Sequence, residues 1–200
     1  KTGDTTGYYS ALEVLKDDSI DVAVLETARG GMIKKGLGFK NAKVCVITSL
    51  SEDHMGMEGI NTIEELGKVK SLIKEGLDND GVMVVRATQD IVNLFNDKDK
   101  LILFDDNCNE LIKRHVQSGG EAFYAEDGFI IQNKSGEEKR LVKLSDIDFT
   151  HNGISKSNTR NVMTAIASIS KIHDDIHEII DSIKSIKCDL DTNRGRQNII

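Results

Sequence analysis

Short apolar runs alternate with segments of helical periodicity over the first half of the chain. The runs are nearly continuous, which is typical of strands buried on both faces of a parallel sheet. We expect strands at residues 21–26, 43–48, 81–85 and 101–104. Helices are expected at residues 8–16, 61–75 and 91–96. A turn is expected at residues 29–31, Arg-Gly-Gly. Alternation of strand and helix predicts a doubly wound α/β sheet with right-handed crossovers.

The pattern changes in the second half, where turn residues separate shorter apolar segments. Strands are expected at residues 122–125, 128–132 and 141–144. Their spacing indicates antiparallel pairing. Two helices follow, at residues 159–172 and 175–186. The predicted fold is therefore three-layer α/β, with a mostly parallel, Rossmann-like doubly wound sheet and a small antiparallel β insertion at about residues 121–150.

The composition is that of an ordinary soluble globular protein, with 38% hydrophobic and 30% charged residues. A net charge of −7 argues against a general nucleic-acid or anionic-membrane surface, and no apolar run approaches the roughly 18 residues of a membrane span. Cys45, Cys108 and Cys188 are widely spaced, which argues against a metal finger or a disulfide framework. With no basic-then-apolar leader in the sequence, we expect a cytoplasmic protein.

Two candidate metal ligands follow predicted strands. Glu26 ends the first apolar run, and His54 closes a Ser-Glu-Asp-His run just after the second. Ligands of open α/β sheets bind beyond the carboxyl ends of the strands. A carboxylate there can hold Mg²⁺, and a neutral imidazole can ligate a metal. The alternatives are a Glu26 carboxylate satisfied by nearby backbone amides and a purely structural His54.

One predicted helix carries three lysines, Lys68, Lys70 and Lys74. Asn61 or Thr62 can cap the start of this helix. Pattern alone does not separate the three lysines, and each could be a solvated lysine on the helix face.

A later helix carries two asparagines with spacing i, i+3, Asn158 and Asn161. This spacing places both amides on one helix face. Paired amides can read the edge of an adenine, since each offers a donor and an acceptor. The alternative for Asn158 is an ordinary N-cap.

The order and spacing of these candidates resemble the central, ATP-binding domain of the Mur ligase family and, within it, the cyanophycin synthetases. The most specific parts are the Glu-Thr-Ala-Arg-Gly-Gly run from Glu26 and the Ser-Glu-Asp-His run that ends at His54. Other matching positions are Gly3-Asp4, Thr6-Gly7, Ser10-Ala11, Gly36-Leu37-Gly38-Phe39, Gly59-Ile60, Thr62, Val69-Lys70, Asn158, Asn161 and Gly195-Arg196. The resemblance covers nearly the whole chain and implies one Mur ligase central domain over residues 1–200.

The resemblance implies a ligase that uses ATP and Mg²⁺. In such enzymes ATP phosphorylates a carboxylate, and an amine attacks the acyl phosphate to give an amide. Glu26 would help hold the Mg²⁺ between the β- and γ-phosphates, and His54 would hold a second Mg²⁺ near the acceptor carboxylate. Lys70 would be the lysine that the family converts to a carbamate. Contacts with the nucleotide are implied for Asn158, Asn161 and Arg196.

Some parts of the family pattern are missing from this sequence. The Gly-rich phosphate loop that ends Gly-Lys-Thr/Ser is not present, nor is the C-terminal domain that closes over ATP. The chain starts without a methionine and stops soon after Arg196, so we expect a fragment truncated at both ends and inactive alone. Residues 86–90 replace the family's Asn-Ala-Asp-Asp run, and the proline before Gly195 is absent, which puts a nucleotide role of residues 88–90 in doubt.

The implied parent is a ligase of the cyanophycin synthetase kind, which joins arginine to the β-carboxylate of aspartate on a growing polymer. Its expected partners are a small-molecule amino acid and a polypeptide or polymer acceptor, with no nucleic acid and no membrane. Any homo-oligomer would form through the parent. The alternatives are another Mur-type ligase, such as a folylpolyglutamate synthase or a peptidoglycan precursor ligase, and a non-catalytic α/β binding module. Glu26, His54 and Lys70 together favour the enzyme.

Overall fold

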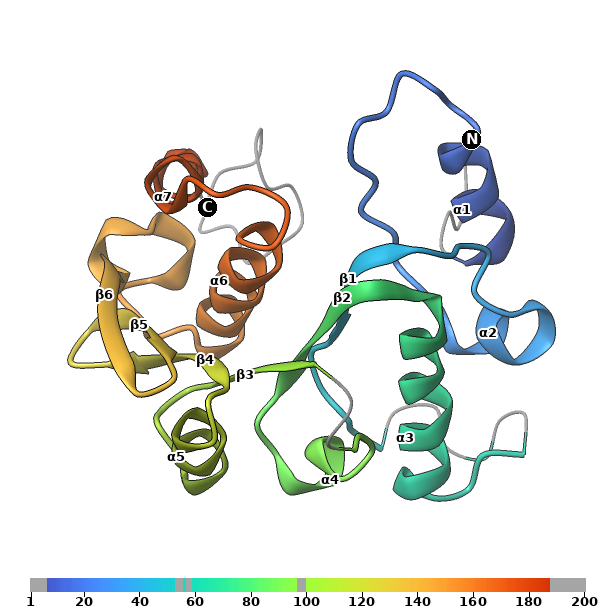
Figure 1. Ribbon diagram of the computed structural model, residues 1–200, viewed down its shortest axis with the longest axis horizontal. Helices are drawn as coiled ribbons and strands as arrows, with labels where there is room; N and C mark the ends of the chain where they lie inside the picture. The colour runs from blue at the N-terminus through green and yellow to red at the C-terminus, as the bar shows by residue number, and fades with distance from the viewer. Residues whose placement is uncertain (1–6, 53–55, 57–58, 97–99, 188–200) are drawn as a thin grey trace. The chain divides into compact units, whose positions relative to one another are not determined.

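The computed structural model describes residues 7–52, 56, 59–96 and 100–187 (Figure 1). The chain divides into two compact units. The first unit contains the residues up to Met83 together with Asp90–Lys100, and the second contains Val84–Gln89 and the residues from Leu101 onward. Within the described parts of the chain, no helix is long and apolar enough to cross a membrane.

The sheet contains the strands β1 (Ala42–Ile47), β2 (Leu77–Arg86), β3 (Leu101–Asp105), β4 (Glu121–Glu126), β5 (Phe129–Lys134) and β6 (Glu137–Lys143), in that order. β3 and β4 pair in parallel, whereas β4–β5 and β5–β6 pair antiparallel. The bonds Met83 N–Lys100 O (2.9 Å) and Ala87 N–Phe104 O (2.8 Å) advance equally on both strands, as in a parallel pair. The predicted α/β class, with its antiparallel insertion, is confirmed.

The first unit contains α1 (Tyr8–Leu15), α2 (Arg29–Lys35), α3 (Ile63–Ser71) and the 3-10 helix η1 (Leu72–Gly76). A capping box starts α3: Thr62 Oγ1 accepts from the Glu65 N–H at 3.1 Å, and the Glu65 carboxylate accepts from the Thr62 N–H at 3.1 Å. Two N–H groups without helical partners are thus satisfied. The helix expected at residues 61–75 is confirmed as α3 and η1. The helix expected at 91–96 is one turn, α4 (Gln89–Val92).

The strand expected at residues 21–26 is wrong. These described residues form no strand, and Figure 1 shows an irregular segment between α1 and α2. Val22 is 60% exposed and Val24 is 95% exposed. A strand needs a neighbour for its backbone N–H and C=O groups, and the apolar pattern says nothing about that neighbour. The turn expected at 29–31 is also wrong, because α2 begins at Arg29.

The second unit contains α5 (Glu110–Gln117), η2 (Leu144–Asp146), η3 (Asp148–Thr150), α6 (Lys156–Ile169) and α7 (Ile176–Ser185). The sequence pattern did not indicate α5. Asn109 caps α5, because its side-chain oxygen accepts from two backbone N–H groups at 3.0 Å. α6 contacts β3, β4 and α7. Its buried face includes Met163 and Ile166. α6 and α7 confirm the two predicted helices, although α6 begins three residues earlier than expected.

Candidate active site

Lys70 reaches the carboxyl end of β1. Its Nζ donates to the carbonyl oxygen of Ser49 at 3.0 Å. Ser49 lies two residues beyond Ile47, the last residue of β1. Ligands of open α/β sheets bind at this edge. The structure therefore brings Lys70 to the expected edge, against the segment that continues into the Ser-Glu-Asp-His run.

The neighbouring lysines have different surroundings. Lys68 pairs with Glu64 at 2.7 Å, with both side chains more than two-thirds exposed, and this carboxylate raises the pKa of Lys68. Lys74 lies over the ring of Phe95, with its Nζ 5.7 Å from the ring centroid. For Lys70, the described contact of Nζ is the one with the Ser49 carbonyl just beyond the strand end. Sequence pattern could not separate the three lysines, and the choice of Lys70 as the functional one stays a prediction.

Gly67 explains how α3 comes close enough for this contact. A Cβ added at Gly67 would lie 3.1 Å from Leu94 Cδ2 and 3.3 Å from Leu50 Cδ2. Leu50 follows Ser49, so Gly67 lets α3 approach the segment that Lys70 contacts. Glycine inside a helix costs roughly 1 kcal/mol relative to alanine. The close approach is a physical reason for accepting that cost.

The remaining predicted metal ligands are only partly described. Glu26 is exposed, and its backbone carbonyl accepts from the Gly7 N–H at 3.3 Å. His54 and Arg196 lie outside the described residues, so the convergence of Glu26 with His54 stays a prediction. Among the side chains that are described, no three His, Cys, Asp or Glu residues form a metal-binding group. A Mg²⁺ ion on Glu26 would take its other oxygen ligands from phosphate, water or residues outside that part.

Asn158 and Asn161 lie in the first two turns of α6. Ser155 is the N-cap of this helix, and its Oγ accepts from the Asn158 N–H at 3.4 Å, so the interpretation of Asn158 as the N-cap is wrong. The Asn158 side chain donates to the Phe149 carbonyl at 2.6 Å. Asn161 is exposed. The i, i+3 spacing within one helix is confirmed, and an adenine contact stays a prediction.

Sequence reasoning missed an ion-pair network at the carboxyl ends of β2 and β3. Arg86 ends β2 and Asp105 ends β3, and Arg86 Nε donates to Asp105 Oδ1 at 3.2 Å. Arg86 Nη2 lies 3.8 Å from Asp106 Oδ2, and Arg160 Nη1 on α6 donates to that same oxygen at 2.7 Å. The available signals were Arg86 directly after one apolar run and the Asp105-Asp106 pair after another.

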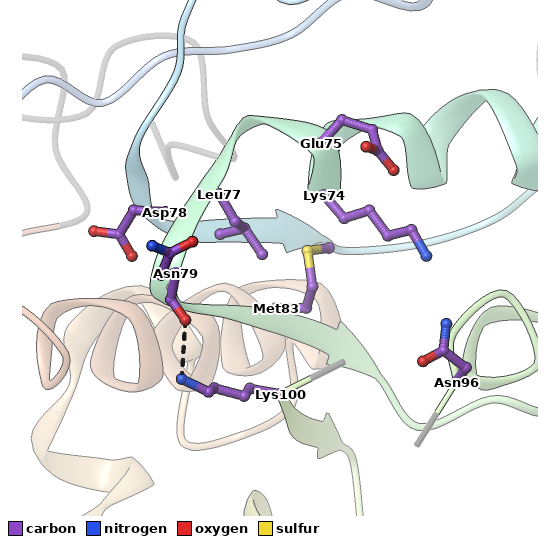
Figure 2. Close-up of a pocket in the computed structure, with 9 residues that line it drawn as sticks. Lys74, Glu75, Leu77, Asp78, Asn79, Met83, Asn96 and Lys100 are labelled. Atoms are coloured by element: carbon purple, nitrogen blue, oxygen red, sulfur yellow. Dashed lines mark hydrogen bonds between the residues drawn. The ribbon is translucent and has the colours of Figure 1, made fainter. Parts of the chain in front are cut away.

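A pocket of about 380 Å³ lies elsewhere in the first unit (Figure 2). It borders the amino-terminal half of β2, and Figure 2 shows Lys100 donating to the Asn79 carbonyl, at 3.2 Å. Its lining residues are Lys74, Glu75, Leu77, Asp78, Asn79, Gly81, Met83, Asn96 and Lys100. Nucleotides of open α/β sheets bind beyond the carboxyl ends of strands, so this pocket is not the predicted nucleotide site.

Comparison with known proteins gives one consistent family. The model of the Mur ligase middle domain matches residues 1–169. The chain is 32% identical to cyanophycin synthetases from Nostoc sp., over 202 residues, and from Crocosphaera subtropica and Synechocystis sp., over 200 residues. These alignments include 98–100% of this chain but only 22–23% of the relatives' length. The chain therefore belongs to the Mur ligase family, as a protein with a Mur ligase middle domain.

Proposed function

We propose that the chain is part of an ATP-dependent, amide-bond-forming ligase of the cyanophycin synthetase kind. The whole enzyme would add arginine to the β-carboxylate of aspartate through an acyl phosphate, in the cytoplasm. Membership of the Mur ligase family and 32% identity to cyanophycin synthetases along the chain support this proposal. The observation that carries it is the bond between Lys70 Nζ and the Ser49 carbonyl, at the carboxyl end of β1.

The proposed roles follow from the chemistry of each side chain. ATP would supply the phosphoryl group, and Mg²⁺ would neutralise the charge that develops on it. Glu26 and His54 would act as metal ligands, a carboxylate oxygen and an imidazole nitrogen. Asn158, Asn161 and Arg196 would contact the nucleotide. Asn161 suits this role because its amide is exposed and offers both a donor and an acceptor.

Lys70 would act as a carbamate. The neutral amine of Lys70 would bond to the carbon of CO₂ and release a proton, which converts a cationic side chain into an anionic one. An ammonium group beside Mg²⁺ is repelled by the like charge, whereas a carbamate is attracted. The Ser49 carbonyl holds Nζ at 3.0 Å and thereby directs any group on Nζ toward the strand end.

Substitution of Lys70 in the full-length enzyme tests this role. We expect Lys70→Ala to lower kcat by at least about a hundredfold, the effect of removing one group that stabilises a transition state. A short carboxylic acid in the buffer, such as acetate, should restore part of the activity because it supplies the missing anion. Amide formation is followed with arginine and an aspartate acceptor.

Lys68→Ala is the matched control, because Lys68 lies on the same helix and its side chain pairs with the exposed Glu64. It should remain within about twofold of the parent, as expected for an exposed pair. An unimpaired Lys70→Ala enzyme would leave Lys70 as a structural lysine. Turnover with glutamate and a folate, but not with arginine and aspartate, would instead favour a folylpolyglutamate synthase.

A further inference from the structure

Arg160 joins the start of α6 to the end of β3. Its Nη1 donates to Asp106 Oδ2 at 2.7 Å, across 54 residues of sequence. The two side chains are 25% and 22% exposed, so water screens this pair less than a fully exposed one. Arg160 lies between Asn158 and Asn161 in the sequence. The contact therefore anchors the part of α6 that carries both asparagines.

Asp106 is itself held in place by its neighbours. Its backbone N–H donates to Asp105 Oδ1 at 2.8 Å. The other Asp105 oxygen accepts from Asn109 Nδ2 at 2.9 Å, and Asn109 Nδ2 also donates to the Ala87 carbonyl at 2.9 Å. The ends of β2 and β3 and the cap of α5 are thus linked. Arg160 consequently binds to a fixed point and not to a mobile surface carboxylate.

In the described part of the chain, the Asp106 carboxylate has few hydrogen-bond donors apart from Arg160. Asp106 Oδ1 is buried and has no hydrogen-bond partner among the residues that the structure describes. Arg160 supplies the short bond to the carboxylate, and Arg86 is more distant, at 3.8 Å. A buried carboxylate is costly without a compensating donor. The ion pair with Arg160 joins this carboxylate to α6.

The geometry of α6 lets the contact between Arg160 and Asp106 fix the orientation of the helix about its axis. Thr159 and Met163 lie on the buried face of the helix. At about 100° per residue, Arg160 and Asn158 leave the helix on opposite sides of that face, and Asn161 points away from it. The ion pair between Arg160 and Asp106 therefore opposes rotation of α6 about its axis. Such a rotation would move both asparagine amides.

We propose that Arg160 is a positioning residue for nucleotide binding, acting through Asp106 on the orientation of Asn158 and Asn161. This inference rests on the proposed function, in which those two amides contact the nucleotide. Arg160 itself does not need to touch ATP. Without Arg160, the orientation of α6 would have to be fixed when ATP binds, and this cost would weaken nucleotide binding. The chemical step would be unchanged once ATP is bound.

The test uses steady-state kinetics of the full-length enzyme and the affinity for a non-hydrolysable ATP analogue. We expect Arg160→Gln to raise the KM for ATP and the Kd of the analogue about tenfold, with kcat within about twofold. Asp106→Asn should give a similar shift, and the double variant should add little further, because the Arg160–Asp106 ion pair is lost in all three. Arg160→Lys, which keeps the charge, should recover most of the affinity.

Arg140→Gln is the matched control, since Arg140 pairs with Asp127 at 3.4 Å and both side chains are largely exposed. It should leave the KM for ATP unchanged. A lower melting temperature of Arg160→Gln with an unchanged KM, or additive effects of Arg160→Gln and Asp106→Asn, would overturn the inference. Asn158→Ala and Asn161→Ala separate the two proposals: if they leave the KM unchanged, the nucleotide site itself is misplaced. If Arg160→Gln does not fold, Asp106→Asn alone decides the result.

Discussion

Residues 21–26 and strand β3 look alike as sequence but differ in structure. Each is a continuous apolar run that ends on a carboxylate, Glu26 in one and Asp105 in the other. Val24 is 95% exposed, whereas Phe104 is fully buried. β3 has β2 on one side and β4 on the other, while the described residues 21–26 belong to no strand. An apolar run therefore predicts a strand only where the fold also supplies a backbone neighbour.

The two units show the same difference on a larger scale. In the second unit, side chains at the strand ends bind one another, as Arg86 and Asp105 do. In the first unit, Glu26 is exposed on an irregular segment, and Lys70 contacts a backbone carbonyl beyond β1. Irregular segments on a rigid scaffold commonly carry binding and catalytic residues. The proposed chemistry of Glu26 and Lys70 thus lies in the unit with the less regular structure.

The difference between residues 21–26 and β3 would be contradicted if both apolar runs contributed equally to the free energy of unfolding. We expect Leu103→Ala in β3 to lower the free energy of unfolding by about 2–5 kcal/mol, because Leu103 is 1% exposed. Val24→Ala should change it by no more than about 0.5 kcal/mol. Urea unfolding of this chain measures both values. A large loss for Val24→Ala would show that residues 21–26 are buried in solution.

A second substitution tests whether the stability of the first unit depends on the close packing of α3 at Gly67. Gly67→Val should lower the free energy of unfolding by about 1–3 kcal/mol, because the added side chain would overlap Leu50 and Leu94. Lys68→Val is the control for the lower helix propensity of valine, since Lys68 is exposed on the same helix. Thermal unfolding monitored by circular dichroism compares the two variants. Equal stabilities would mean that α3 does not depend on a close approach at Gly67.

The smallest expected effect concerns pH and the second unit. Burial lowers the pKa of His115, although hydrogen bonds to the backbone of Leu101 and Glu121 oppose this shift. The unfolded histidine takes up a proton near pH 6.5 while the folded one stays neutral, so stability should fall as the pH drops below about 6.5. The fall should level off once the folded ring is protonated.

Unfolding in urea at several pH values measures this dependence. His115→Gln should reduce the slope of stability against pH. The same slope in the parent and in His115→Gln would assign the pH dependence to other groups. The effect should be smaller than that of either substitution above, because a single half-buried histidine is involved.

Local sequence signals predicted several elements well. Thr62 and Glu65 define the start of α3 through a capping box, whose partners are only three residues apart. The alternating apolar runs predicted β1, β2 and β3, and the turn residues predicted the antiparallel strands β4 to β6. α5 was missed because Ile112 and Val116 are its only buried residues, which is a short apolar pattern.

The site was less predictable than the fold. The i, i+3 spacing of Asn158 and Asn161 was visible in the sequence, but the choice of Ser155 as the cap was not. Serine and asparagine are both good caps, and the backbone decides which one occupies the cap position. The network around Arg160 was missed because its partner, Asp106, is 54 residues away.

The sequence alone therefore determined the α/β class, the positions of most helices and strands, and the resemblance to the Mur ligase family. These properties depend on local spacing, capping and apolar periodicity. Only the tertiary structure decided that Lys70 Nζ reaches the Ser49 carbonyl just beyond β1, and that residues 21–26 belong to no strand. Contacts between distant segments depend on how elements pack in space, and no local pattern of residues encodes that packing.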